Sequence, residues 1–203
     1  MAKLQLFANS ALSNSEMLRK VIHISGFLIP LICVQFLSIY LVSVALFLVI
    51  IVYTISEVAR VHEMNFPVFS TVTRKAAKSI FEVKYFATAP IAFTLGITLS
   101  LLFFPPSIAY TSITVLTLGD SFANIFGKVF GKTPLPFNRK KTFEGTICGF
   151  VCAFFGSILF VNPMKALVAV TVGMLVESLP LHIDDNLAIP LSAGMVLLFI
   201  SIF

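Results

Sequence analysis

A run of acidic, amide, glycine and lysine residues follows an apolar segment, between Gly119 and Gly145. Within it, Asp120, Asn124 and Lys128 recur every four residues, so a helix would place them along one side. A carboxylate close to lysines offers an oxygen ligand for a divalent cation and donors for phosphate oxygens. The segment therefore predicts a site for a magnesium-bound nucleotide.

The rest of this segment carries further groups that suit a polyphosphate. Gly127 and Gly131 allow a close approach of the backbone, and cations follow at Lys132, Arg139, Lys140 and Lys141. It is not a P-loop, because GKVFGKT has three residues between its glycines where that motif has four, and no strand precedes it. An alternative remains open. The segment could be a positively charged loop between two membrane helices, with Asp120 capping a helix or paired with a lysine.

A second polar cluster lies in a short turn between the last two apolar stretches, and it consists of Glu177, His182, Asp184, Asp185 and Asn186. Two adjacent aspartates repel one another unless a cation intervenes. One Asp or Asn of this turn is expected to cap the last helix, which accounts for only one of them. The other acids are candidate metal ligands.

A third candidate is His23, which follows Lys20 by three residues and Arg19 by four. A histidine one turn inside an apolar helix is either packed and hydrogen-bonded or functional. In the second case it would contact phosphate or relay a proton. The spacing alone leaves both interpretations open.

The composition indicates that membrane helices position these groups. AVILMFWYC residues make up 58% of the 203-residue chain, Asp, Glu, Lys and Arg only 11%, and the mean hydropathy is +1.02. Soluble domains carry about 25% charged residues. The composition excludes a soluble globule and a disulfide scaffold, and it argues against nucleic-acid binding despite the net charge of +5. Lipid must be the main solvent of this chain.

We expect one all-α domain over residues 1–203, a polytopic helix bundle with about seven transmembrane helices. Each is largely apolar, although several are shorter than the 20 or so residues that an isolated span needs. The predicted spans are Val21–Phe36, Leu37–Tyr53, Phe86–Phe104, Ser107–Leu118, Phe143–Val161, Met164–Val176 and Leu187–Phe203. The fourth is expected to continue into GDSFANIFGK.

The basic residues predict the orientation. With the N-terminus in the cytoplasm, seven spans put every Lys and Arg except Lys165 on the cytoplasmic side. The cytoplasmic loops are then about 54–85, 119–142 and 177–186, and the polar groups gather at one face. In addition, Ser13 and Glu16 fit a capping box. The apolar spacing of residues 68–80 predicts an amphipathic surface helix.

Three motifs resemble a known family. They are LRKVIHISG, GDSFANIFGKVFGKTPLPFNRKKTFEGTICG and ESLPLHIDDNLAIP, in that order along the chain. Together they resemble the CTP-dependent polyprenol kinases, a family that includes dolichol kinase, phytol kinase and CTP-dependent diacylglycerol kinase. A more distant similarity connects them to phosphatidate cytidylyltransferases.

The resemblance implies phosphoryl transfer from CTP to the hydroxyl of a membrane isoprenoid or lipid alcohol, with Mg²⁺ or another divalent cation and release of CDP. It implies catalytic roles for Asp120, His23, Lys141 and Asp185, and metal binding by Asp120, Asp185 and Glu177. Lipid or phosphate contacts fall on Arg19, Lys20 and Asn186. The nucleotide would be bound by Asn124, Gly127, Lys128, Gly131, Lys132, Lys140, Lys141, Glu144 and Gly145. Asp184 duplicates the expected acid, so either aspartate of the pair could be the ligand.

The resemblance also implies a multi-pass protein of the cell membrane or endoplasmic reticulum, with the active site facing the cytoplasm. Its partners would be CTP, the lipid alcohol and the bilayer. Two alternatives are kept. A cytidylyltransferase would join CMP to a lipid phosphate and release pyrophosphate. A small transporter would carry its charged residues near the bilayer midplane, whereas here they gather at one face.

Overall fold

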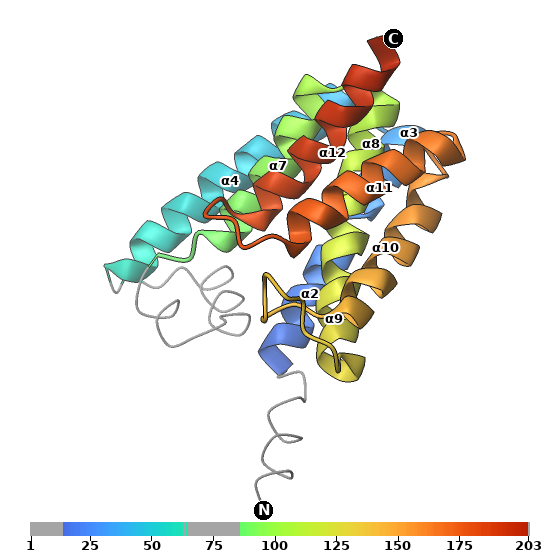
Figure 1. Cartoon of the computed structure of the whole chain (residues 1–203). Coiled ribbons are helices and arrows are strands. Elements are labelled where there is room, and N and C mark those ends of the chain that lie inside the picture. The colour runs from blue at the N-terminus through green and yellow to red at the C-terminus, as the bar shows by residue number, and fades with distance from the viewer. Residues whose placement is uncertain (1–13, 63, 65–85, 203) are drawn as a thin grey trace, which may run out of the picture.

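The computed structural model describes residues 14–62, 64 and 86–202, and within these residues it is helical with no strand beyond one isolated bridge between Pro134 and Thr142. Figure 1 shows the helices packed side by side as a bundle. In chain order they are α2 (Asn14–Ser25), α3 (Leu28–Gln35), α4 (Ile39–Val61), α7 (Ala89–Phe103), α8 (Pro106–Thr114), η1 (Val115–Asp120), α9 (Ser121–Phe130), α10 (Phe143–Ser157), α11 (Pro163–Ser178) and α12 (Asp185–Ile202). The predicted all-α class is confirmed.

Each of the seven predicted spans corresponds to helix. Three helical stretches of the described residues are long and apolar enough to cross a membrane, namely Glu16–Gln35, Ile39–Val61 and Asp185–Ile202. The first contains α2 and α3, separated by a short break at Gly26 and Phe27. The remaining helices of the described residues do not meet the criteria of length and hydropathy together, so the count of seven spans stays a prediction.

The exterior of the bundle is apolar and its interior contains many polar groups. Large side chains such as Phe36, Tyr40 and Phe155 are exposed, whereas Thr114 and Thr117 are completely buried. The two threonine hydroxyls donate to carbonyls of their own helix, at 2.7 and 2.8 Å. This distribution suits a bundle in lipid, where apolar side chains need no cover and small polar groups pack between helices.

The centre of the bundle is a helical rod formed by α8, η1 and α9. It runs without interruption from Pro106 to Phe130, and α10, α11 and α12 all pack against η1. Asp120 lies at the end of η1 and Asn124 on α9, so the predicted continuation of the fourth span into the polar motif is confirmed. A π-helix inside an α-helix is frequently found at functional sites.

The second predicted span is longer than expected, because α4 continues to Val61 rather than ending at Tyr53. The predicted loop of residues 54–85 includes Glu57 and Arg60, but the structure places both residues on α4, where they are buried. The Arg60 Nη2 donates to the Glu57 Oε1 at 2.5 Å, one turn apart. Since the two charges compensate one another, the helix can continue into a region that neither residue would enter alone.

Two glycine contacts hold the helices close to the polar centre. A Cβ on Gly145 of α10 would lie 2.5 Å from the Ala123 carbonyl oxygen of α9. A Cβ on Gly96 of α7 would lie 2.1 Å from the carbonyl oxygen of Asn186, in the first turn of α12. Only glycine permits these approaches. These contacts hold the start of α10 against α9 and the start of α12 against α7.

Two sequence predictions lie outside the described residues. The capping box needs Ser13, and the amphipathic helix covers residues 68–80; neither segment is described.

Candidate active site

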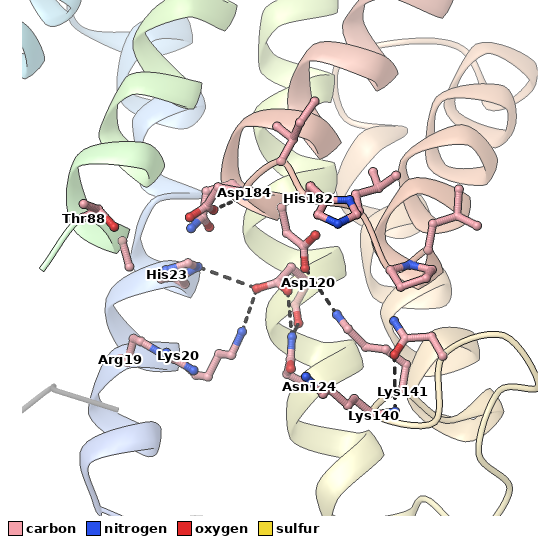
Figure 2. Close-up of a pocket in the computed structure, with 18 of the residues that line it drawn as sticks. Arg19, Lys20, His23, Thr88, Asp120, Asn124, Lys140, Lys141, His182 and Asp184 are labelled. Atoms are coloured by element: carbon pink, nitrogen blue, oxygen red, sulfur yellow. Dashed lines mark hydrogen bonds and ion pairs between the residues drawn. The ribbon is translucent and has the colours of Figure 1, made fainter. Parts of the chain in front are cut away.

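The polar motifs meet around one cavity of about 830 Å³. Its walls come from α2, the start of α7, η1 with α9, the loop of residues 131–142 and the turn between α11 and α12 (Figure 2). Of the predicted site residues, it brings together Arg19, Lys20, His23, Asp120, Asn124, Lys128, Lys140, Lys141, Asp184, Asp185 and Asn186. This volume is in the range of small-molecule sites.

Asp120 lies at the centre of the cavity, and Figure 2 shows the neighbouring side chains pointing toward it. Its Oδ2 accepts a hydrogen bond from the Lys20 Nζ at 2.6 Å, and its Oδ1 accepts one from the Asn124 Nδ2 at 2.7 Å. The His23 Nδ1 lies 3.8 Å from Oδ2. Asp120 is thus ion-paired with a lysine, as the alternative interpretation allowed, yet the pair lines a cavity.

Lys141 connects the other acids. Its Nζ is hydrogen-bonded to the Glu177 carboxylate and lies 3.6 Å from the Asp185 Oδ2. Burial disfavours the ammonium form, but Glu177, Asp120 and Asp185 outweigh that effect and raise the pKa of Lys141. The side chain therefore keeps its positive charge at neutral pH, which a phosphate-binding role requires.

The loop of residues 131–142 is folded back on itself. The Leu135 N–H donates to the Lys141 carbonyl at 2.9 Å, and the Thr142 side chain caps α10 by accepting from the Gly145 N–H at 3.2 Å. Glu144 accepts from the Thr133 N–H through both carboxylate oxygens, at 3.1 and 3.2 Å. Glu144 therefore closes the loop and is not among the residues that line the main cavity, so its contact with a nucleotide stays a prediction.

Several other predicted contacts also lie outside the main cavity. Gly127 and Glu177 line a smaller adjoining cavity of about 60 Å³. Gly131 and Gly145 pack against the backbone or side chains of α9 and Thr142. Lys132 is exposed to solvent and lines neither cavity. The glycines of the motif thus allow the close packing of α9 on α10.

The predicted metal ligands are of the right chemical type, since Asp120, Asp185 and Glu177 all offer carboxylate oxygens. The Glu177 Oε2 is buried without a hydrogen-bond partner. The described residues hold no ready cluster of three such ligands. Each of these acids is instead paired with a lysine. The set fits a cation that arrives with a nucleotide, because Mg²⁺ in such sites takes one or two carboxylates together with phosphate oxygens.

The structure adds cavity residues that the sequence analysis missed. Asn138 lines the cavity and its Nδ2 donates to the Ser178 carbonyl at 3.0 Å, connecting the loop to the end of α11. Thr88 and Ala89 form the wall at the start of α7. Asn138 directly precedes the run of cations, which was a usable signal. Thr88 lies in no polar motif and nothing in its spacing marks it.

Comparison with known proteins finds relatives among plant enzymes. The chain is 32% identical to phytol kinase 1 of Arabidopsis thaliana over 122 residues, covering 51% of this chain and 40% of the relative. It is 34% identical to farnesol kinase of the same plant over 124 residues, covering 52% and 40%. The chain is a homologue of these isoprenoid alcohol kinases. The family resemblance inferred from its motifs is thereby confirmed.

A probable phytol kinase of Glycine max shows 32% identity over 127 residues, covering 53% of this chain and 43% of that protein. The chain thus spans less than half the length of the curated relatives it matches. All three relatives are chloroplastic proteins by name, which differs from the predicted cell membrane or endoplasmic reticulum. No family model matches the chain, and no solved structure matches it.

Proposed function

We propose that the protein is a membrane-embedded kinase that transfers the γ-phosphoryl group of CTP to the hydroxyl of an isoprenoid alcohol. The observation that carries this proposal is the cavity around Asp120, in which lysines and amides surround carboxylates in a homologue of phytol and farnesol kinases. A polyphosphate with its cation needs this combination of donors and oxygen ligands. The choice of CTP over ATP follows from the family resemblance of the motifs.

The residues of the cavity have separate roles in this proposal. Lys128, Lys140 and Lys141 bind phosphate oxygens, and Asn124 and Asn138 contribute amide donors. In the reaction the alcohol oxygen forms a bond to the γ-phosphorus, the bond to the β,γ-bridging oxygen breaks, and CDP leaves with that electron pair. Positioning and charge neutralisation by such groups supply most of the rate in phosphoryl transfer. The hydroxyl proton must also leave, and His23 is the proposed relay.

A divalent cation would be held by Asp120 with Asp185 or Glu177, and it would neutralise charge on the phosphates. Lys20 and Lys141 compensate these acids in the structure described here. Binding of the nucleotide would then release lysine side chains from carboxylates to phosphates. Such an exchange keeps buried charge compensated before and after binding.

We also propose that all seven apolar segments span the membrane with the N-terminus and the cavity on the cytoplasmic side. The charge pattern supports this orientation, because only Lys165 would lie on the other face. Microscopy of the tagged protein would distinguish among the cell membrane, the endoplasmic reticulum and a chloroplast membrane as its location.

The test is transfer of label by the purified chain in detergent, with farnesol, phytol, geranylgeraniol, a dolichol-type polyprenol and diacylglycerol as acceptors. We expect label from [γ-³²P]CTP to appear in an alcohol and label from [α-³²P]CTP to stay in CDP. The Asp120→Asn variant should lose at least about a hundredfold in turnover, because the amide keeps the shape without the charge. Circular dichroism of the same sample checks that the fold survives the loss of the buried pair with Lys20.

The alternatives give different results. A cytidylyltransferase would leave α-label on a lipid phosphate, release pyrophosphate and fail on a free alcohol. A transporter would transfer neither label. Transfer of α-label alone would therefore replace the kinase proposal with the cytidylyltransferase, and near-normal turnover by Asp120→Asn would remove Asp120 from the mechanism.

A further inference from the structure

The cavity has two chemically different ends. Lys128, Asn138 and Lys140 lie at one end, on α9 and the loop of residues 131–142, where the nucleotide phosphates are proposed to bind. Thr88 and His23 lie on the other side of Asp120, at the wall formed by α7 and α2 (Figure 2). None of the proposed nucleotide contacts lies on this second wall.

A buried polar clamp on α4 fixes the α7 part of this wall. The Glu57 Oε1 accepts from the Ala87 N–H at 2.8 Å, and the Tyr53 hydroxyl donates to the Ala87 carbonyl at 3.4 Å. Glu57 is itself compensated by Arg60. Both backbone groups of Ala87 are therefore held, and the next residue is Thr88. Glu57 and Tyr53 act as positioning residues for the edge of the cavity.

Thr88 keeps its hydroxyl available at this edge. It occupies the N-cap of α7, but its side chain makes no capping hydrogen bond to that helix. The other threonines of the helix differ, since the Thr94 hydroxyl donates to Pro90 and the Thr98 hydroxyl to Thr94, each to a carbonyl of the helix itself. A hydroxyl at a cavity wall can both donate to and accept from a ligand hydroxyl.

His23 provides a second, independent sign of a ligand. His23 lines the cavity and is only 8% exposed. Its imidazole ring is stacked on the ring of Phe93 of α7, with 4.1 Å between the ring centroids. Its Nδ1 is buried without a hydrogen-bond partner. The Asp120 carboxylate, at 3.8 Å from this nitrogen, lies beyond hydrogen-bonding distance. A buried nitrogen without a hydrogen bond is costly, and a bound polar group would remove that cost. Arg19, one turn earlier on α2, brings a guanidinium to the same wall.

We propose that the α2–α7 wall is the acceptor subsite, where the hydroxyl of the lipid alcohol binds between His23 and Thr88. Arg19 then holds the phosphate of the product, for which a guanidinium is well suited. The assignment rests on the proposed kinase function. It places acceptor and donor on opposite sides of Asp120, so that the phosphoryl group crosses the centre of the cavity.

The experiment compares Thr88→Val with Thr88→Ser in the purified chain, using farnesol and CTP as substrates. The valine keeps the volume and removes the hydroxyl, while the serine retains it. Thr88→Val should raise the KM for farnesol about threefold to tenfold, as expected for one lost hydrogen bond, and leave the KM for CTP unchanged. Thr88→Ser should resemble the wild type, and so should the control Thr94→Val.

Binding of tritiated farnesol without nucleotide is measured in parallel, because it does not depend on catalysis. Thr88→Val should weaken this binding by the same factor. A raised KM for CTP alone would assign Thr88 to the donor end and overturn the inference, and so would unchanged constants for both substrates. If the wild type transfers no phosphate, the proposed function fails, and farnesol binding still decides whether Thr88 contacts the alcohol.

Discussion

The ion pair between Lys141 and Glu177 offers the sharpest test of the energetics of this site. The Glu177 side chain is completely buried, that of Lys141 is 18% exposed, and the second oxygen of Glu177 has no partner. Replacing Lys141 by Met leaves an isolated carboxylate inside the bundle. Breaking a buried pair in this way costs about 3–5 kcal/mol. Asp185 adds little, because its side chain is 37% exposed and lies 3.6 Å from the Lys141 Nζ.

The matched variant removes the second charge. In the double variant Lys141→Met with Glu177→Gln the buried pair is replaced by neutral side chains, and the Asp185 carboxylate that remains is partly exposed to solvent. We expect its free energy of unfolding to return to within about 1 kcal/mol of the wild type, because apolar or neutral replacement of a buried pair is often neutral. Glu177→Gln alone should cost less than Lys141→Met, since the remaining ammonium is partly exposed and lies near Asp185.

Unfolding free energies of all four proteins can be measured in mixed micelles by titration with a denaturing detergent, followed by circular dichroism. Phosphoryl transfer measured on the same samples separates stability from function. The double variant should be stable and still lose about a hundredfold or more in turnover, because Lys141 also binds phosphate in our proposal. A cost below about 1 kcal/mol for Lys141→Met, or costs that simply add in the double variant, would refute this account of the pair.

The Lys141 ammonium also makes a pH prediction. Because the pKa of Lys141 is raised above its ordinary value of 10.5, its contribution to stability is fully present at neutral pH and below, and it is lost only as the pH rises above that ordinary value.

Two further predictions test the arrangement of the helices. Cysteines placed singly at Lys140 and Lys165 in a cysteine-free background should be labelled by an impermeant maleimide from opposite sides of sealed vesicles, and labelling from one side would contradict seven spans. Gly96→Ala should destabilise the protein and impair turnover, because the new Cβ would lie 2.1 Å from the Asn186 carbonyl oxygen and force α7 and α12 apart. Thr94→Ala on the same helix is the control. A Gly96→Ala protein with normal thermal stability would disprove the close contact.

Sequence alone determined the solvent and the class of this protein. So few charges among so many apolar residues require lipid, and lipid requires helices or a closed barrel, because every backbone hydrogen bond must be made within the chain. The alignment of Asp120, Asn124 and Lys128 also follows from sequence, since the spacing of residues on one helix face depends only on the helical repeat. The structure agrees, with Asn124 donating to Asp120 one turn away.

Only the tertiary structure decided which side chains meet across helices. Lys20 pairs with Asp120 a hundred positions along the chain, and Lys141 pairs with Glu177, because the packing of the helices brings these segments together. Such contacts depend on packing in three dimensions, which the local spacing of residues does not encode.

Packing also explains features of the structure that the local sequence did not predict. Glu144 has the charge of a ligand but lies where it closes the loop at Thr133, and α4 continues past Tyr53 because Glu57 and Arg60 compensate one another inside the bundle. The role of a charged side chain thus depends on which partner lies within reach. The tertiary fold determines the partners of Glu144 and Glu57, and the local sequence does not show them.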